Sequence, residues 1–540
     1  MSTLPETLPE TLTPVRPASA PSASSRLAAS AGTIALATAA SRILGFVRDL
    51  LIAKLFGTGI QAQAFVVAFR LPNLFRDLVA EGAMTTAVVP VLSAARATTS
   101  PQDFWRLAQA LGVRILVAVS ILGAAGWLLA PWLVMLIAPG FASEPEKFSL
   151  TVRLTRILFP FITLVGLWAF FCGLLNALRH FAMPALGPAA LNVVMIAGCL
   201  WVVPHVVPGI VGLAWAVMCG GLIQLAMQLP AASSRGFRWR WVWRHEGSRE
   251  VMRLLAPRLV GAAVYQVSVL FDTILASLGM LAGEGAVAAL YFANRLVQLP
   301  LALFATASAQ AMLPMLSERA ALKDLQTFRA TLLTLLRMVA FESIPAAVGL
   351  IVLAVPIVQV CFERGAFDPK ATIMTASTLS WLAVGLLAYA ASKVLSGAFY
   401  ALHDTATPVR LAIQALIVNM VLAVIFIGPL KVGGLALATA CSSSFNAWRL
   451  LRALEQRLNA SLVSELTAPL LRIGAAALVM GAACWMAWQG LALTLPPLAA
   501  LPLVIVGGLL VYGLSCTLLG VDELAMVRRW LARLFTTPSS

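Results

Sequence analysis

The chain has 540 residues, of which 60% are hydrophobic and 11% are charged, and its mean hydropathy is +0.91. Apolar stretches of 18 or more residues recur along nearly its whole length, so the composition excludes a soluble globular protein and indicates a polytopic α-helical membrane protein. The formal net charge of +16 does not indicate nucleic-acid binding, because the basic residues gather in alternate loops between the apolar stretches.

The chain begins with a segment, residues 1–27, that is rich in Pro, Ser, Thr and Ala. We expect a disordered cytoplasmic tail here. No basic region leads directly into a short apolar core, so no cleaved signal peptide is expected. Fourteen apolar spans follow, near 31–56, 62–94, 104–138, 150–177, 183–205, 209–231, 252–279, 285–317, 327–361, 372–401, 407–429, 433–455, 467–490 and 496–519.

The loops between spans alternate in charge. One set holds most of the arginines, whereas the other set is poor in charge or mixed, as in Glu144-Pro-Glu-Lys147. Basic loops stay on the cytoplasmic side, so both termini are predicted to be cytoplasmic, with 526–540 as a second tail. The largest basic loop, 232–250, contains Arg238-Trp-Arg-Trp-Val-Trp-Arg244. We interpret it as a cytoplasmic linker anchored at the lipid headgroups, with a functional lipid site as the alternative.

The sequence also repeats itself. Val89-Pro-Val-Leu-Ser93 matches Leu313-Pro-Met-Leu-Ser317, and Ala177-Leu178 matches Ala401-Leu402, in both cases 224 residues further along. The repeat predicts two pseudo-symmetric six-helix lobes, 28–231 and 251–457, with a substrate site between them. The spans in 458–525 lie outside the repeat, which makes the predicted fold all-α with two extra C-terminal transmembrane helices.

Charged residues interrupt the first two spans, between Ser41 and Arg96. Each one placed in hydrocarbon costs at least about 2.5 kcal/mol, so they need water, partners or an ionic ligand. Cations outnumber anions, which favours an anionic ligand, and arginine suits phosphate because its planar fork binds two oxygens. Helical spacing predicts three lone cations that are unpaired on their own helix faces: Arg48, Arg76 and Arg295. It also predicts two sets of opposite charges that share a helix face and partly neutralise each other: Arg42 with Asp49, and Arg70 with Asp77 and Glu81.

Neither a metal site nor an enzyme is indicated. The seven cysteines are scattered singly through apolar segments, without a CxxC motif or a Cys/His cluster. There is no GxxxxGK[ST] loop for a nucleotide, and the four histidines lie in loops or at span ends without a carboxylate pair. We therefore expect no cofactor.

Four motifs resemble the MurJ (MviN) family of lipid II flippases: Ser41-Arg-Ile-Leu-Gly-Phe-Val-Arg-Asp49, Phe69-Arg-Leu-Pro-Asn-Leu-Phe-Arg76, Ala80-Glu-Gly-Ala83 and Phe362-Glu-Arg-Gly-Ala-Phe367. The resemblance runs from about residue 28 to 520. It implies the fold of the multidrug/oligosaccharidyl-lipid/polysaccharide (MOP) exporter superfamily. It also implies that the last two spans form a groove for the undecaprenyl tail.

The resemblance implies a set of substrate-binding residues, namely Arg42, Arg48, Asp49, Arg76, Glu81 and Arg295. Two positions depart from relatives that carry carboxylates, since Gln63 and Asn294 are neutral here. Some relatives bind sodium in the second lobe, where Asp272 and Asn419 would contribute. Ala423 stands where a further carboxylate is expected, so we predict no metal ion.

The predicted function is transport of lipid II from the cytoplasmic to the outer leaflet of the bacterial inner membrane by alternating access. The cavity arginines would bind its pyrophosphate. Membrane lipids are further expected partners, and the cell-wall synthesis machinery is a possible one, whereas nucleic acid is not. An exporter of another polyprenyl-linked glycan or of drugs in the same superfamily is the alternative. A non-transporting scaffold of the cell-wall machinery is a third hypothesis.

Overall fold

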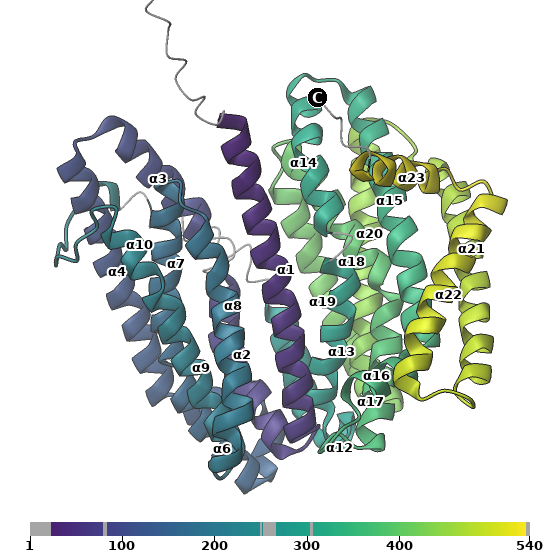
Figure 1. Ribbon diagram of the computed structural model, residues 1–540, viewed down its shortest axis with the longest axis horizontal. Helices are drawn as coiled ribbons and strands as arrows, with labels where there is room; N and C mark the ends of the chain where they lie inside the picture. Colours follow the sequence, from purple (N-terminus) through teal and green to yellow (C-terminus); the bar gives the residue numbers. More distant parts are fainter. Residues whose placement is uncertain (1–22, 79–83, 249–250, 252–265, 303–305, 536–540) are drawn as a thin grey trace, which may run out of the picture.

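The computed structural model describes residues 23–78, 84–248, 251, 266–302 and 306–535, and these contain helices and loops but no strand. The helices form two bundles that approach each other at the lower end of Figure 1 and diverge toward the upper end. Helix α1 runs between the bundles and packs mainly on α8 of the first.

The first lobe contains ten α-helices: α1 (Ala23–Phe56), α2 (Ile60–Leu78), α3 (Met84–Thr98), α4 (Pro101–Leu128), α5 (Ala130–Ile137), α6 (Pro145–Leu158), α7 (Phe161–Ala177), α8 (Ala182–Ala197), α9 (Gly209–Ala226) and α10 (Gln228–Ser233). Short turns of 3₁₀ or π geometry join some of them, at Pro139–Ser143, Gly198–Val202 and Val203–His205. Because α1 begins at Ala23, the last five residues of the predicted disordered tail are helical, and residues 1–22 lie outside the described part.

The second lobe begins with an apolar helix over Gln266–Ser277. It continues with α12 (Gly279–Ala282), α13 (Ala286–Pro300), α14 (Thr306–Ala321), α15 (Leu325–Val352), α16 (Ala354–Phe362), α17 (Pro369–Val384), α18 (Leu386–Ala401), α19 (Ala406–Leu430) and α20 (Val432–Leu458). Two further helices, α21 (Leu462–Leu491) and α22 (Pro497–Leu518), lie at its outer edge, and α23 (Asp522–Phe535) crosses its upper end (Figure 1).

The two lobes repeat each other in detail, which confirms the predicted pseudo-symmetry. Both lobes have a side-chain cap at the start of α4 or α15, a leucine between that helix and the next, and a corner residue in the left-handed conformation with φ of 59°. The members of each pair are 224 residues apart: the caps are Ser100 and Asp324, the leucines are Leu129 and Leu353, and the corner residues are Arg179 and His403. Caps and left-handed corners end helices at defined residues, so the same turns recur in both lobes.

The number of membrane spans remains a prediction. Within the described residues, eight helices or helix runs are long and apolar enough to cross a membrane, and the α17–α18 pair, bent by 42°, makes a ninth. Every one of the fourteen predicted stretches contains helix, but several are broken into shorter pieces, as where α15 ends at Val352 and α16 begins at Ala354.

Packing joins the helices through three main clusters of buried side chains. The largest extends across both lobes at their shared end and includes Phe161 of α7 and Phe292 of α13. A third cluster holds α21 and α22 against α15, where the Tyr512 hydroxyl donates to the Phe341 carbonyl at 2.8 Å. The extra helices therefore have a packing unit of their own.

Close backbone contacts join the lobes at the lower end. The Ala366 amide donates to the Lys54 carbonyl at 2.9 Å, and the Gly140 amide donates to Ser277 Oγ at 3.2 Å. Gly57 has φ of +55°, and a Cβ there would overlap the Ala366 carbonyl oxygen. Only glycine accepts both that conformation and that approach.

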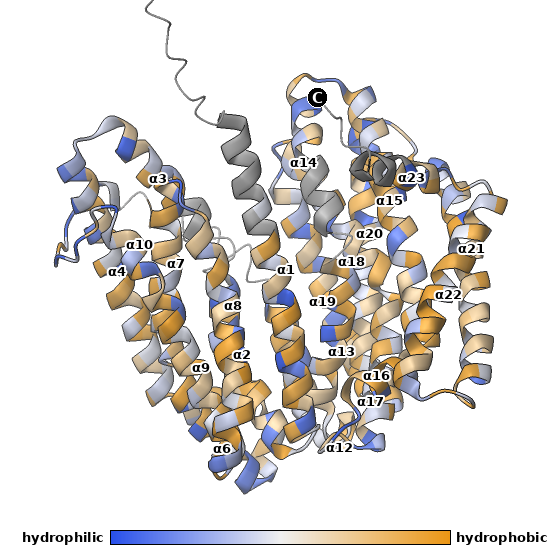
Figure 2. Ribbon diagram, viewed as in Figure 1, coloured by the Kyte–Doolittle hydropathy of each residue, from blue (hydrophilic) through white to orange (hydrophobic). Residues whose placement is uncertain are grey.

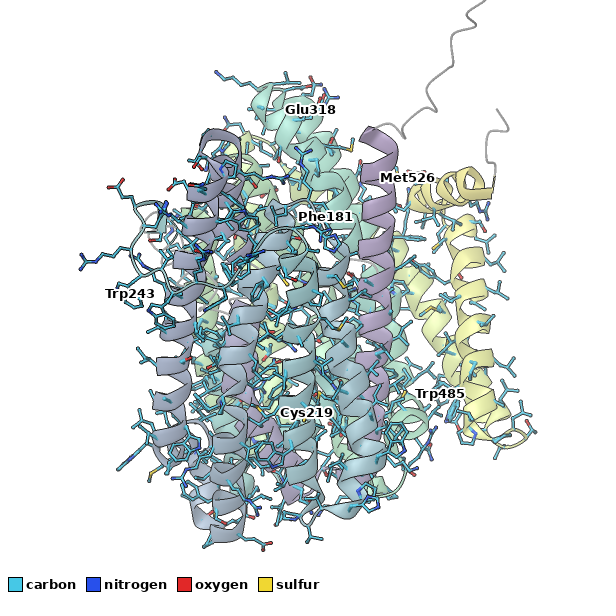
Figure 3. The ribbon with its side chains drawn as sticks, turned by 60° about the vertical axis from the view of Figure 1, so that its left-hand side comes forward. Phe181, Cys219, Trp243, Glu318, Trp485 and Met526 are labelled. Carbon is cyan, nitrogen blue, oxygen red and sulfur yellow. The ribbon has the colours of Figure 1, made fainter. Side chains whose placement is uncertain are left out.

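The basic linker is irregular rather than helical over 237–245. Gln109 and Arg114 of α4 donate to the carbonyls of Arg238 and Trp243, at 2.8 and 3.1 Å. Trp243 projects outward from the first lobe (Figure 3). The depth of the linker in the membrane stays a prediction.

Hydropathy is lowest at the two ends of the bundles, and hydrophilic positions also interrupt α1 part-way along its length (Figure 2).

Candidate functional site

The candidate site is centred on the Asp49 carboxylate of α1, which is only 2% exposed. Arg48 Nε and Nη2 donate to Asp49 Oδ1 at 3.0 and 2.8 Å. From α13 of the other lobe, the Tyr291 hydroxyl donates to Oδ1 at 3.0 Å, and Arg295 Nε lies 3.2 Å from Oδ2. A single carboxylate thus binds a guanidinium group from each lobe.

Arg48 is also held by α8. Its Nη1 donates to Asn192 Oδ1 at 2.9 Å, and Asn192 Nδ2 in turn donates to the Ser41 carbonyl at 2.9 Å. Gly45 of α1 faces this amide, and a Cβ there would touch Asn192 Nδ2 at 3.4 Å, an ordinary van der Waals contact. Around this glycine α1 is one continuous helix, from Ala23 to Phe56.

Arg295 keeps unused hydrogen-bonding capacity. Its Nη1 donates to Gln298 at 3.2 Å, its Nη2 donates to the Tyr291 hydroxyl at 3.3 Å, and the guanidinium group lies 4.8 Å from the centre of the Tyr291 ring. Its Nε is buried and has no hydrogen-bond acceptor among the described residues, because Asp49 lies within ion-pair distance but out of line. The side chain is 30% exposed, so an anion can reach it.

Arg76 and Asp77 of α2 form a neighbouring pair. Arg76 Nη2 lies 3.0 Å from Asp77 Oδ1, and both side chains are partly exposed. Asp77 also interacts electrostatically with Arg295. The three arginines predicted to converge, Arg48, Arg76 and Arg295, therefore belong to one network of charges that draws on both lobes.

The one remaining predicted residue that the structure describes, Arg42, lies elsewhere. Arg42 Nη1 donates to the carbonyl of Ala302, in the second lobe, at 2.7 Å, and Arg42 interacts electrostatically with Lys393 of α18. It contacts a different part of the interface from Asp49. Glu81 lies outside the described residues, so its position is not part of the structure.

The structure corrects the expected pairing. Asp49 pairs with its chain neighbour Arg48 and with Arg295 rather than with Arg42 on its own helix face. Arg48, Arg76 and Arg295 are not unpaired, since each has an aspartate partner. Helical periodicity missed these pairs because adjacent long side chains can meet by bending back, and because Arg295 comes from the other lobe.

Two residues of the network were not foreseen, Asn192 and Tyr291. Both are neutral, whereas the residues predicted for the site are all ionisable. A signal exists for each. Asn192 is a buried amide in an apolar helix, and Tyr291 lies one helical turn before Arg295.

Gln63 and Asn294, which are neutral where relatives are expected to carry carboxylates, each make a local hydrogen bond. Gln63 Nε2 donates to the Thr58 carbonyl at 3.2 Å, and Asn294 Nδ2 donates to the Leu290 carbonyl at 3.1 Å. Neither adds a negative charge near Arg295, so the network retains three arginines against the two aspartates Asp49 and Asp77.

A second polar cluster surrounds Asp272 in the second lobe. Asp272 Oδ1 accepts from Asn419 Nδ2 at 3.1 Å, and Oδ2 accepts from Thr439 Oγ1 at 3.2 Å. Ala423 is fully buried and supplies no oxygen ligand. Both carboxylate oxygens are thus occupied by neutral donors, and within the described residues no three His, Cys, Asp or Glu side chains gather for a metal ion.

Comparison with known proteins gives one consistent family. Residues 52–494 match the family model described as lipid II flippase MurJ. The chain is 34% identical over 431 residues to a lipid II flippase MurJ of Burkholderia cenocepacia, covering 79% of this chain and 83% of the relative. It is 37% identical over 447 residues to a probable lipid II flippase MurJ of Vibrio cholerae, covering 80% and 83%.

Solved structures agree with this result. A lipid II flippase MurJ in an inward closed conformation superposes with a TM-score of 0.78 at 26% identity, covering 91% of this chain and 99% of the other. A multidrug resistance transporter of the MATE family and MOP superfamily gives a TM-score of 0.64 at 17% identity, covering 78% and 94%. The second likeness concerns the fold alone.

Proposed function

The chain belongs to the MurJ family of lipid II flippases, and we propose that it carries lipid II from the cytoplasmic to the outer leaflet of the bacterial inner membrane. The family is one of transporters rather than enzymes. The relatives' names support the substrate, and the observation that carries the proposal is the convergence of Arg48 and Arg295, from opposite lobes, on the buried Asp49 carboxylate.

In this proposal Asp49 occupies the position that the pyrophosphate takes when lipid II binds. A carboxylate and a phosphate accept the same bidentate contacts from a guanidinium group, but a pyrophosphate has more oxygens and more charge. The unused Arg295 Nε and the partial exposure of Arg295 and Arg76 favour such an exchange. Lipid II would displace Asp49 from Arg295 while Arg48 stays held by Asn192.

The exchange provides a link to alternating access. Tyr291 and Arg295 join α13 to Asp49 of α1, so they tie the two lobes together. When the pyrophosphate replaces Asp49, this tie is lost, and the lobes can move about the close contacts at their other junction, between Lys54 and Ala366. A ligand shifts a conformational equilibrium only through different contacts in the two states, and here the change of partner at Arg295 is that difference.

We assign the undecaprenyl tail to the surface of α21 and α22. Both helices are rich in exposed apolar side chains, and Trp485 of α21 projects outward in Figure 3. Their separate packing on α15 leaves this surface facing the lipid. The tail can then remain in hydrocarbon while the charged head crosses between the lobes.

An exporter of another polyprenyl-linked glycan would use the same pyrophosphate contacts, so the network alone does not choose between glycans. A drug exporter for cationic compounds needs an excess of carboxylates, whereas three arginines and two aspartates make this network positive. We also expect the protein to work together with the cell-wall synthesis machinery.

Complementation tests the proposed function. A strain whose own lipid II flippase can be shut off should grow when this chain is expressed, and should accumulate less lipid II in the inner leaflet. An Arg48→Ala/Arg295→Ala variant expressed at the same level is the matched control, and it should not support growth. Failure of the wild-type chain, despite stable insertion, would reject lipid II as its substrate.

A further inference from the structure

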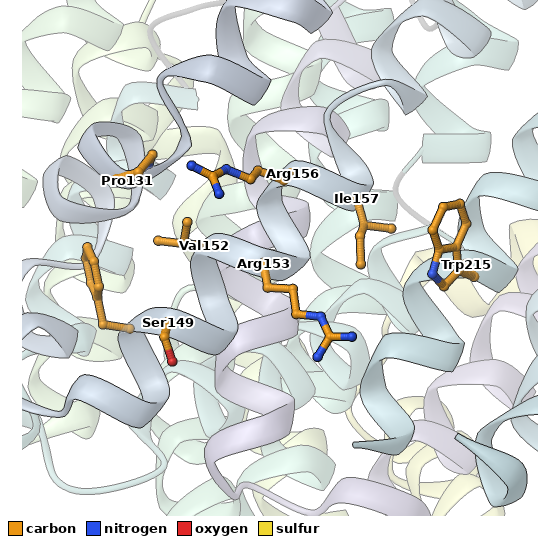
Figure 4. A pocket seen from close by; sticks show the side chains of 8 residues that line it. Pro131, Ser149, Val152, Arg153, Arg156, Ile157 and Trp215 are labelled. Carbon is orange, nitrogen blue, oxygen red and sulfur yellow. The ribbon is translucent and has the colours of Figure 1, made fainter. Parts of the chain in front are cut away.

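A hollow of about 580 Å³ lies in the first lobe, away from the Asp49 network. Figure 4 shows it between α5, α6 and α9, with two arginine side chains on its wall. The lining side chains are Pro131, Phe148, Ser149, Val152, Arg153, Arg156, Ile157 and Trp215. Most of this wall is apolar, so the hollow combines an apolar surface with the positive charges of two arginines.

The two arginines are available to a ligand. Arg153 and Arg156 are both exposed, and neither forms an ion pair with a carboxylate among the described residues. The acidic residues that precede them, Glu144 and Glu146, form no ion pair with either arginine among the described residues, and Glu144 pairs with Lys147 at 3.1 Å. In Figure 4 their guanidinium groups point to different sides of the hollow. Because they lie three residues apart on α6, both can turn toward a phosphate that lies between them.

A second hollow continues the first. It has a volume of about 460 Å³, lies between α4 and α7, and is lined by Ser120, Gly123, Ala124, Trp127, Leu128, Pro160 and Thr163. The guanidinium group of Arg156 lies 5.6 Å from the centre of the Trp127 ring, so it sits where the two hollows meet. The second hollow is almost entirely apolar, which suits an acyl chain and not a headgroup.

The position in the fold identifies the leaflet. The hollows lie toward the end of the first lobe where α6 begins, opposite the end that carries the described part of the basic linker, 232–248 (Figure 1). By the charge asymmetry of the loops this is the outer end. Exposed Trp127 and Trp215 are consistent with the depth of lipid headgroups, where indole rings concentrate.

We propose that this pair of hollows binds one anionic phospholipid of the outer leaflet, with its phosphate between Arg153 and Arg156 and one acyl chain along Trp127. The site does not depend on lipid II transport, since it shares no residue with the Asp49 network. Each basic residue near an anionic lipid surface contributes roughly a fivefold gain in affinity at low salt. Removing both arginines should therefore weaken binding about 25-fold.

Native mass spectrometry of the full-length protein, titrated with phosphatidylglycerol or phosphatidylcholine, measures this binding. We expect a tightly bound phosphatidylglycerol that Arg153→Gln/Arg156→Gln loses. The matched control is Lys370→Gln/Lys431→Gln, which removes two exposed cations from the same end of the second lobe and should leave the binding unchanged. Equal phosphatidylglycerol affinity in the arginine variant and the control would overturn the proposal.

Two further arms separate the parts of the lipid. Ser149→Trp, at an exposed position on the wall, fills the first hollow while keeping both arginines and should also weaken phosphatidylglycerol binding. It keeps the test decisive if the arginine variant does not fold. Inorganic phosphate should compete only weakly, because it lacks the acyl chain. Competition by inorganic phosphate at the same concentration as the lipid, or equal binding of phosphatidylcholine, would show that no anionic phospholipid site exists here.

Discussion

Replacing Asp49 by asparagine should lower stability and raise affinity for pyrophosphate at the same time. The side chain keeps its shape and an accepting oxygen, but the charge that Arg48 and Arg295 share is lost. Breaking one side of a buried ion pair costs about 3–5 kcal/mol. Because the Arg295 side chain is 30% exposed, water offsets part of this loss, and we expect about 3 kcal/mol.

The same free energy opposes the ligand in the wild-type protein, because pyrophosphate must displace Asp49 from Arg295. Removing that competitor should tighten pyrophosphate binding by up to about a hundredfold. Pyrophosphate should also restore stability to the variant, by roughly 2.7 kcal/mol at a concentration a hundred times its Kd.

Thermal unfolding monitored with a thiol-reactive dye measures both effects, since Cys172, Cys199, Cys484 and Cys516 are buried in the folded protein. The unfolding temperature would be followed with and without inorganic pyrophosphate. Asp103→Asn is the control, because this half-exposed carboxylate pairs only with His245 and contributes less than about 1 kcal/mol. A folded Asp49→Asn protein that binds pyrophosphate no more tightly than wild type would refute the exchange.

Three other predictions concern the rest of the chain. In a background without the exposed native Cys219, Met280→Cys should react with an impermeant label from outside the cell and Ser234→Cys should not; the reverse pattern would invert the topology. A chain ending after Arg457 should still insert but should not support growth, because it lacks α21 and α22; full growth would remove their role with the lipid tail. Hydrogen bonds from Thr407 hold the pKa of Asp404 below its usual value, so this group stabilises the protein above about pH 4 and loses its contribution as the pH falls further. Asp404→Asn should flatten the acid side of the unfolding profile, and an unchanged slope would contradict this.

The sequence was sufficient for the fold because its main signals are local or repeated. Apolar stretches predict helices wherever they occur, and the match between 89–93 and 313–317 predicts two similar lobes. Caps at Ser100 and Asp324, and corners at Arg179 and His403, extend that repeat to single residues. The breaks within stretches were less accessible, since hydropathy averages over the few residues at which one helix ends and the next begins.

The site was predictable only in outline. Charges within apolar spans pointed to Arg48, Asp49 and Arg295, because buried charges are costly wherever they occur. Their pairing was not predictable, since Arg295 lies 246 residues after Asp49 in the chain and meets it only because the folded lobes bring the two side chains together. Asn192 was missed for the same reason: a neutral amide acquires its role only when the fold brings it to Arg48.

The central claim is that Arg48, Arg76 and Arg295 bind the pyrophosphate of lipid II during transport. Its most direct test is translocation of labelled lipid II by purified protein in liposomes, normalised to folded protein. Each Arg→Ala variant should lose one charge-assisted contact worth roughly 1.5–3 kcal/mol, and so about ten- to a hundredfold in transport at limiting substrate, while Arg295→Lys should recover part of it. Wild-type rates from folded Arg48→Ala, Arg76→Ala and Arg295→Ala variants would contradict the account.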